Sequence, residues 1–452
     1  MISRDEIICK SEELEVHPVN VERDYVFGWV LAGIYSASGL GKRLILKGGN
    51  CFRKAYFEAA RYSPDLDFAT TSRLAPEFIK TELARVCAFA QANSGVNFEI
   101  ERTRVEEKPC ADENKHIHEV RLYFRGFFGE ESQMVISIRM DIGELERIIL
   151  PVQERNLIHS YSDSAACVAQ LRCLKLEETL ASKLKCLLQR RHVADLFDFV
   201  NATFVSPTIE INQQEIISAF LQMTIFRPGP RVVRDLLLNL PFDIIRGFWE
   251  KYVVCPRSCV IDFDQARSRF ERIVESLFGS LPPMRSELAF FPAHLRNPIM
   301  EAGYKMTTLR VVYHGVEREV EPYSLKYKIR KDGVGQEYLY VWDQTGGRSS
   351  PPGLKTFLHT GIKSIENTDN QFEPRFEVEL SKAGQFFQER YFHSSPRSWV
   401  RAWSPRRQSS HAYTLECPVC GKRFYRDRYS TTLNPHKDNY GNRCLGRIGI
   451  LV

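Results

Sequence analysis

A short stretch near the N-terminus, Leu46–Thr70, constrains the fold more than any other part of the sequence. It opens with an apolar run that ends at the pair Gly48-Gly49, and the following Asn50–Ala60 has helical spacing. The glycines therefore predict a strand-to-helix turn. Glycine lets backbone N–H groups approach an anion closely at a helix start, so the turn suits a phosphate.

Two carboxylates follow that predicted helix. Pro64 stops the helix, and the alternation in the residues after it predicts a strand that carries Asp65 and Asp67. Side chains two apart on a strand point the same way, so both carboxylates face one side. Such a pair repels unless a cation or a shared proton lies between its members. At neutral pH a divalent metal is a simpler way to offset this repulsion than a shared proton. Mg²⁺ is commonly bound by carboxylates and substrate phosphates.

The glycine pair, one helix and then Arg-x-Ser-x-Asp-Leu-Asp-Phe resemble the AbiEii/AbiGii toxin family of the DNA-polymerase-β-like nucleotidyltransferases. The preceding Glu22–Gly33 resembles the helix that leads into this motif in one subgroup. In that superfamily a third carboxylate on a neighbouring strand completes the metal site, and Asp141, late in the predicted strand Gln133–Ile142, has the expected order. The resemblance thus implies a Mg²⁺ site formed by Asp65, Asp67 and Asp141, with NTP as substrate.

The same resemblance implies a set of residues around the glycine turn that hold the nucleotide. They are Lys47, Gly48, Gly49, Asn50, Arg53 and Ser63. A further family motif resembles the amphipathic stretch Leu174–Val200, which implies that Lys183 reaches the triphosphate with help from Arg190 or Arg191. Asp195 and Asp198 match the end of that motif, and Asp195 is taken as catalytic.

Two positions depart from the family pattern. Asn50 stands where a Ser or Thr is usual, and Ala194 stands where an Arg precedes the first Asp of the last motif. The departures keep a second function open, a nucleic-acid-binding sensor or regulator with a degenerate transferase domain. Transfer of a nucleotide to a protein hydroxyl is a third possibility.

Composition sets the remaining limits. The chain of 452 residues, 43% of them hydrophobic, is long enough for several domains with real cores. We expect a cytoplasmic protein without a membrane partner, because it has no long apolar run and its N-terminus lacks a signal core. Nine of the twelve cysteines are scattered, as in a reducing compartment. Residues 391–452 hold 11 Lys/Arg against 3 Asp/Glu, so the net charge of +6 comes from the tail.

The part after residue 205 first shows helical patterns and then, from about Thr307, strands. The strand region resembles a WYL-type domain, a small SH3-like β-barrel that is thought to hold nucleic acid or nucleotide ligands. That resemblance implies Tyr323, Arg330 and Arg348 as ligand contacts. Aromatic side chains on short strands are equally typical of a barrel core, so this alternative stays open.

The tail contains Cys417-x2-Cys420, followed by His436 and Cys444. Three thiols and one imidazole suit a closed, tetrahedral, structural Zn²⁺ site. Because this segment has little apolar content, we expect it to need the metal to fold. Basic residues interleaved with aromatic ones suit phosphate contacts and base stacking. The basic residues are Arg423, Arg426, Arg428, Lys437 and Arg443.

These inferences predict an α+β chain of four parts. They are a nucleotidyltransferase domain with a mixed sheet (1–205), a helical domain (206–303), a WYL-like barrel (304–390), and a basic linker with a zinc knuckle (391–452). The predicted function is Mg²⁺-dependent transfer of NMP from an NTP to an acceptor, an RNA and in particular a tRNA 3′ end. The family resemblance implies a role in phage defence, abortive infection or a toxin–antitoxin pair, with a cognate antitoxin as partner.

Overall fold

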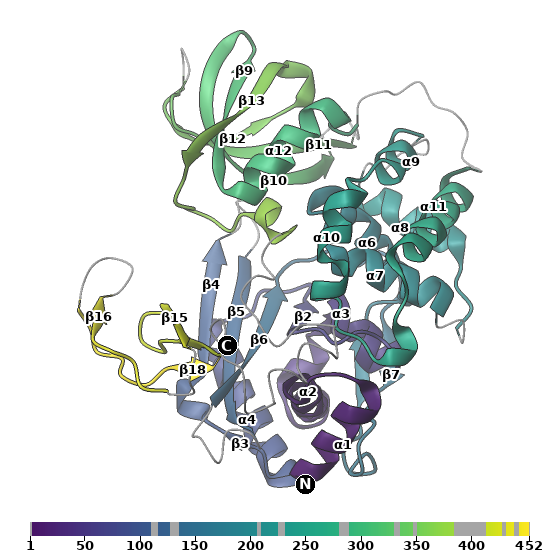
Figure 1. Ribbon diagram of the computed structural model, residues 1–452, viewed down its shortest axis with the longest axis vertical. Helices are drawn as coiled ribbons and strands as arrows, with labels where there is room; N and C mark the ends of the chain where they lie inside the picture. Colours follow the sequence, from purple (N-terminus) through teal and green to yellow (C-terminus); the bar gives the residue numbers. More distant parts are fainter. Residues whose placement is uncertain are drawn as a thin grey trace, which may run out of the picture.

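The computed structural model shows a mixed sheet with its helices, a helical group beside it, and a second sheet above both (Figure 1). It describes residues 2–109, 116–126, 135–205, 209–224, 231–279, 289–329, 335–346, 350–383, 413–426, 431–437 and 443–451.

The N-terminal helices build the base of the molecule. Helix α2 (Pro18–Ala37) is buried along almost its whole length. Most of its side chains are apolar, and the polar residues of its first turns, Asn20, Glu22, Arg23 and Asp24, are buried as well. Helix α1 (Arg4–Leu14) and helix α4 (Pro76–Ser94) pack against it. Pro18 and Pro76 stand in the first turns of their helices, where no intrahelical donor is required.

In the described residues, eleven strands form a mixed sheet on these helices. The strands of the N-terminal part are β1 (Ile45–Lys47), β2 (Asp65–Ala69), β3 (Asn97–Phe98), β4 (Arg104–Pro109), β5 (His116–Arg125), β6 (Val135–Gly143), β7 (Gln153–Asn156) and β8 (Gln170–Cys173). Strand β2 lies between β1, which is antiparallel to it, and β6, which is parallel. The register sets Asp67 opposite Lys47 on one side and opposite Asp141 on the other. The pairing therefore brings residues distant in sequence to one row of the sheet.

The C-terminal tail joins this same sheet. Its strands are β14 (Tyr413–Glu416), β15 (Arg423–Arg426), β16 (His436–Lys437), β17 (Arg443–Cys444) and β18 (Ile450–Leu451). Strand β18 pairs in parallel with β6, with Leu451 opposite Ile136. Strand β5 pairs along one edge of β6. Strands β18 and β2 therefore both pair along the opposite edge of β6. The tail is thus part of the mixed sheet and not a separate appendage.

The helical group begins with two helices that the sequence suggested as one. Helix α6 (Leu176–Gln189) ends before Arg191, whose φ is 53°, and helix α7 (Val193–Val200) follows. Four helices, α8 (Gln213–Met223), α9 (Arg231–Leu238), α10 (Phe242–Tyr252) and α11 (Phe263–Gly279), complete the group. One buried cluster extends from Ile2 to Phe290, so the mixed sheet and these helices share a core.

The second sheet has its own buried cluster, which extends from Phe291 to Leu380. Helix α12 (Ala293–Lys305) packs on it. Its antiparallel strands run in the order β12-β11-β10-β9-β13. They are β9 (Thr307–Tyr313), β10 (Val316–Ile329), β11 (Gly335–Asp343), β12 (Gly353–Phe357) and β13 (Ile362–Gln371). In the described residues β12 does not pair with β13, so the expected closed SH3-like barrel is not observed and the sheet is open.

Short helical turns connect the main elements. They are η1 (Gly39–Lys42), α3 (Gly48–Cys51), η2 (Phe52–Tyr56), η3 (Ile100–Arg102), η4 (Asn201–Val205), η5 (Arg257–Cys259), η6 (His359–Gly361) and η7 (Glu379–Ala383). Within the described residues, no helix combines the length and the apolar character needed to cross a membrane.

Candidate active site

The glycine turn lies where the sequence placed it, between β1 and a helical segment. Gly48 has a φ of 73°, a conformation that glycine adopts at little cost. A Cβ atom on Gly48 would lie 2.2 Å from Oδ2 of Asp67, so the absence of a side chain lets this carboxylate approach the turn. The helical segment is shorter than expected. It ends at Tyr56 instead of Ala60, because α3 passes into a π-type turn.

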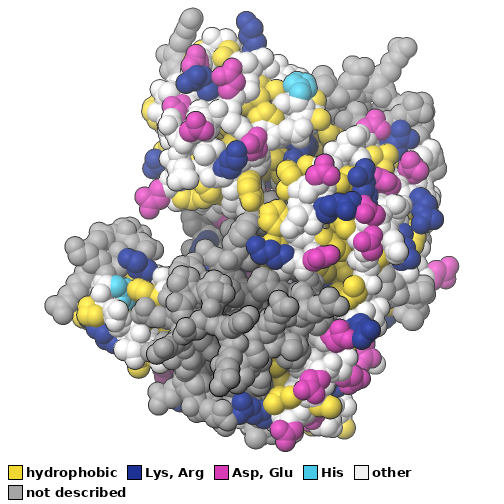
Figure 2. Space-filling view, in the orientation of Figure 1, with side chains coloured by type: hydrophobic (Ala, Val, Ile, Leu, Met, Phe, Trp, Pro, Cys, Tyr) yellow, Lys and Arg dark blue, Asp and Glu magenta, His cyan; other side chains and the backbone are white. Residues whose placement is uncertain are grey.

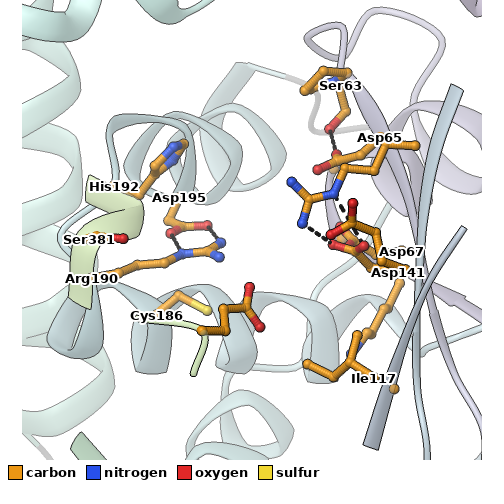
Figure 3. A pocket seen from close by; sticks show the side chains of 18 of the residues that line it. Ser63, Asp65, Asp67, Ile117, Asp141, Cys186, Arg190, His192, Asp195 and Ser381 are labelled. Atoms are coloured by element: carbon orange, nitrogen blue, oxygen red, sulfur yellow. Dashed lines mark hydrogen bonds and ion pairs between the residues drawn. The ribbon is translucent and has the colours of Figure 1, made fainter. Parts of the chain in front are cut away.

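The three predicted metal ligands gather on one side of the sheet (Figure 3). Asp67 and Asp141 are register partners on adjacent parallel strands, and Asp65 lies two residues before Asp67 on the same face. Asp65 accepts a hydrogen bond of 3.0 Å from the Ser63 hydroxyl. Arg139 donates to both oxygens of Asp141, at 2.8 and 3.2 Å. The geometry thus brings together all three carboxylates, and Ser63 with them.

Asp67 has the most unusual electrostatic environment of the three carboxylates. Burial, followed by the charges of Asp65 and Asp141, raises the pKa of Asp67 to about 7. Among the described residues none donates a hydrogen bond to its carboxylate. The charges of Lys47 and Arg190 act in the opposite direction but do not offset this rise. The cluster of acids therefore favours a cation, and three carboxylates are a donor set that Mg²⁺ accepts. The residues present therefore fit the predicted magnesium site.

The ion pair of Arg190 with Asp195 faces the carboxylates across the pocket (Figure 3), and Lys183 and Asp198 extend it. Lys183 Nζ lies 3.0 Å from Asp195 Oδ1 and 2.8 Å from Asp198 Oδ2. Arg190 contacts both oxygens of Asp195, at 2.8 and 2.9 Å. Although burial acts in the opposite direction, Arg190 and Lys183 hold the pKa of Asp195 below its ordinary value. These contacts fix two cations at the pocket wall.

The departure at Ala194 does not leave a gap in this network. Arg61 binds both oxygens of Asp198, at 2.7 and 2.9 Å, and Arg190 binds Asp195 in the same two-pronged way. Two guanidinium groups thus pair with the two acids of the motif, and neither comes from position 194. Arg61 lies immediately upstream of the carboxylate strand, and its contact with α7 crosses 137 residues of sequence.

Three of the predicted nucleotide contacts lie away from the pocket. Arg53 is buried, where it pairs with Asp24 at 2.8 Å. Asn50 is buried as well, and its amide donates to the Asp65 carbonyl at 2.5 Å. Arg191 donates to Asn297 Oδ1 at 2.6 Å. These three expectations are corrected: the side chains support the turn, the core and the contact with α12, respectively.

A pocket of about 1170 Å³ connects the carboxylates with the cations. Of the predicted nucleotide-site residues, Lys47, Gly48, Gly49, Ser63, Lys183 and Arg190 line it. The volume exceeds that of ordinary small-molecule sites, so it has room for more than a nucleotide. Its walls come from the mixed sheet, helix α6, the end of α12, the segment that runs from β13 into η7, and β15 of the tail.

Several pocket residues were missed by sequence reasoning. They are Arg61, Lys108, Glu119, Arg121, Arg139, Glu146, Tyr304, Arg375 and Phe376. Lys47 forms an ion pair with Glu146, and Lys108 forms one with Glu119. The alternation along β5 and β6 could have indicated that Arg121 and Arg139 share a face with Asp141. No sequence signal brings the end of α12 or the segment after β13 to this pocket.

The four tail residues proposed as zinc ligands do come together. Their ligand atoms all lie within 4.8 Å of one another. The Sγ atoms of Cys417 and Cys444 are 3.6 Å apart, close to the roughly 3.8 Å edge of a tetrahedron with Zn–S bonds of about 2.3 Å. The imidazole Nδ1 of His436 lies 2.9 Å from the Asn434 carbonyl oxygen, which leaves Nε2 directed at Cys420. This arrangement fits a structural zinc ion.

The predicted nucleic-acid contacts are described in part. Arg423 lines the pocket and pairs with Glu416 at 3.2 Å, while the backbones of Arg426, Lys437 and Arg443 belong to β15, β16 and β17. Arg428 lies outside the described residues, as do Arg330 and Arg348 of the second sheet. Tyr323 belongs to the core of that sheet, where its hydroxyl donates to Glu321 at 2.5 Å. Its expected ligand contact is therefore corrected to a core position.

Carboxylates in register on parallel strands, a glycine turn beside them and fixed cations opposite define a nucleotidyltransferase. Residues 29–305 match the family described as nucleotidyl transferase AbiEii toxin, Type IV TA system. This match covers more than half of the chain, which therefore belongs to that family of toxins. The expected enzyme class is confirmed.

Solved structures that are similar to this chain include the following two. MenT4, a nucleotidyltransferase toxin of Mycobacterium tuberculosis H37Rv, is 15% identical with a TM-score of 0.39, and the alignment covers 62% of this chain and 91% of MenT4. A crystal structure of a protein from H. pylori, described as a putative nucleotidyltransferase, is 12% identical with a TM-score of 0.34, and the alignment covers 62% of this chain and 96% of that chain. Among curated proteins, none matches the sequence.

Proposed function

We propose that this toxin transfers a nucleoside monophosphate from an NTP to the 3′ end of an RNA, in particular a tRNA, in a Mg²⁺-dependent reaction. The observation that carries the proposal is the row formed by Asp67 and Asp141 on adjacent strands, with Lys183 and Arg190 across the pocket. Asp65, Asp67 and Asp141 would hold the metal. Bound there, Mg²⁺ would activate the acceptor hydroxyl and stabilise the leaving pyrophosphate.

Other residues of the chain would bind the phosphates and offset their charge. Gly48 and Gly49 give the phosphates close access to the backbone, and Lys47 lies at the same end of the pocket. Lys183 and Arg190 offset the negative charge that develops on the phosphoryl oxygens. Asp195 and Asp198 hold Lys183 in place, and Asp195 also holds Arg190. Asp195 and Asp198 are therefore positioning residues in this proposal.

The tail supports an RNA acceptor. Its 11 Lys/Arg against 3 Asp/Glu give it a larger positive charge than the net +6 of the whole chain, and Arg423 brings one of its cations into the pocket wall. The helical group has no comparable bias, since acidic and basic side chains are interspersed over its visible face (Figure 2). We place the RNA along the tail, with Zn²⁺ bound by Cys417, Cys420, His436 and Cys444. A phage-defence or toxin–antitoxin role with a cognate antitoxin is part of the same proposal.

The test is incubation of the purified protein with each labelled NTP, Mg²⁺ and total RNA. We expect label in RNA with wild type and at least a hundredfold less with Asp67→Ala, because removing a carboxylate of the metal site removes transition-state stabilisation. Asp235→Ala is the matched control, since Asp235 is an exposed acid on α9. Label on protein instead of RNA would overturn the proposed acceptor. No label from any NTP would overturn the proposed activity.

A further inference from the structure

Two aromatic side chains of the pocket come from segments that pack with the second sheet, and neither comes from the catalytic sheet. Tyr304 stands in the last turn of α12 and is 39% exposed. Phe376 lies in the connection between β13 and η7. Among the described residues that line the pocket, these two are the sole Phe, Tyr or Trp side chains. The lining contributed by the catalytic sheet and α6 is mainly charged or small.

Phe376 is held in a fixed orientation. Its ring packs edge-on against Tyr323, with centroids 5.4 Å apart at an angle of 76°, and tilts against Trp342 at 6.1 Å. The backbone N–H of Arg375 donates to the Tyr323 hydroxyl at 3.0 Å. A buried aromatic network thus anchors the loop that presents this ring to the pocket.

Arg375 adds a cation to the same wall. Its guanidinium lies over the Trp342 ring, 4.7 Å from the centroid, and its side chain remains 51% exposed. An aromatic face beside an arginine is a common platform for a nucleobase, because every base has a π-face that stacks on a ring or a guanidinium plane. In the proposed reaction the carboxylates and cations of the opposite walls would bind the metal and the phosphates, so the base needs a partner elsewhere in the pocket.

We propose that Tyr304, Phe376 and Arg375 form the nucleobase-binding wall of this active site. The inference rests on the proposed transfer reaction and adds the part of the substrate that the catalytic residues do not recognise. The family match ends at residue 305, so Phe376 and Arg375 belong to a segment beyond the matched region. The base can be that of the incoming NTP or that of the acceptor's terminal nucleotide, and the chemistry of stacking is shared by both.

The experiment measures binding of three probes to the full-length protein in the presence of Mg²⁺. They are inorganic tripolyphosphate, a non-hydrolysable NTP analogue and a single-stranded RNA oligonucleotide. The variants are Tyr304→Ala, Phe376→Ala and Phe376→Tyr, the last of which keeps a stacking ring. Tyr338→Ala is the matched control, since Tyr338 is a half-buried aromatic residue on β11 outside the pocket.

We expect Tyr304→Ala and Phe376→Ala to weaken binding of a base-containing probe by roughly tenfold or more, with tripolyphosphate binding unchanged and Phe376→Tyr near wild type. Loss confined to the NTP analogue assigns the wall to the incoming nucleotide, and loss confined to RNA assigns it to the acceptor. If Tyr304→Ala binds the NTP analogue and the RNA oligonucleotide as tightly as wild type does, the inference is overturned, even if Phe376→Ala does not fold. Failure of wild type to bind tripolyphosphate would instead count against the proposed function, so the two failures are distinguishable.

Discussion

At the scale of single residues, Asp67 is the central group of the site. It lies between Lys47 and Asp141 in the register of the sheet, and Gly48 leaves it the space to approach the turn. Its pKa of about 7 follows first from burial and then from the neighbouring acids. In the metal-free protein the charged form of Asp67 is therefore costly, and a bound cation would remove this cost.

This cost predicts a stability effect of Asp67→Asn. The pKa of Asp67 is higher in the folded protein than its ordinary 3.8, so the metal-free protein gains stability as pH falls from above 7 toward 4. At pH 8 in the presence of a chelator, the Asp67→Asn variant should have a free energy of unfolding up to about 4 kcal/mol higher than that of wild type. The reason is that the substitution removes a charge that is costly in the folded protein. Chemical denaturation at pH 5 and pH 8 measures this difference.

Magnesium supplies the control for this prediction. Mg²⁺ at pH 8 should stabilise wild type and leave Asp67→Asn nearly unchanged, since a ligand stabilises the state that binds it. A variant that is less stable than wild type in chelator at pH 8 would contradict the account given for Asp67.

Single residues near a motif were the hardest to assign from sequence. Arg53 and Asn50 follow the glycine pair closely, yet both turn into the protein, because successive residues of a helical segment face different directions. Asp65, Asp67 and Asp141 could be predicted, since strand alternation and order along the chain determine which side they face. A role that depends on which way a short helix is rotated could not be predicted before its packing was known.

At the scale of elements, the glycine turn at the end of β1 leaves space for the Asp67 carboxylate of β2. Gly48→Ala should reduce nucleotide transfer roughly 100-fold, because the new Cβ would lie 2.2 Å from Asp67 Oδ2 and displace that carboxylate. The positive φ of 73° adds strain of about 1–2 kcal/mol. Steady-state transfer assays and thermal unfolding measure the two effects.

Gly247→Ala is the matched control for this substitution. Gly247 lies within α10 and a Cβ there would meet nothing within 4 Å, so Ala should stabilise the helix by about 0.5–1 kcal/mol without affecting transfer. Equal loss of activity in both variants would show that the effect of Gly48→Ala is not specific to the turn.

The break between α6 and α7 could not be predicted from the sequence. Apolar spacing predicted the helical character of residues 174–200, and the family motif indicated Lys183 and Asp195. The φ of 53° at Arg191 is not visible in that spacing, although it brings Arg190 back onto Asp195. Arg61 reaches Asp198 through tertiary packing alone. Local periodicity therefore identified the elements, while the ion-pair network required the fold.

At the scale of the whole molecule, the active site depends on parts that the sequence suggested were separate. The end of α12 contributes Tyr304 to the pocket, the segment after β13 contributes Phe376, and the tail contributes Arg423. The tail also extends the catalytic sheet through β18, which shares an edge of β6 with β2. Strand patterns can be read from sequence, but a parallel pairing across some 300 residues cannot.

The tail should connect zinc binding with the catalytic sheet. Its buried cluster consists of Leu415, Cys417, Leu433 and Cys444, which is too small a core to hold the segment without the metal. Cys420→Ser should therefore lower the zinc content well below one ion per chain and increase hydrogen exchange in β14, β15 and β18. Exchange in the second sheet should not change, because that sheet has its own core.

Loss of the zinc site should also weaken RNA transfer at least tenfold while binding of an NTP analogue stays near wild type, because the tail is placed on the acceptor side. Cys9→Ser is the matched control, since Cys9 is an exposed cysteine outside the cluster. Metal analysis, exchange mass spectrometry and transfer assays on the same preparations measure the three effects. Unchanged zinc content in Cys420→Ser would rule out the ligand set, and unchanged transfer after zinc loss would separate the tail from the acceptor.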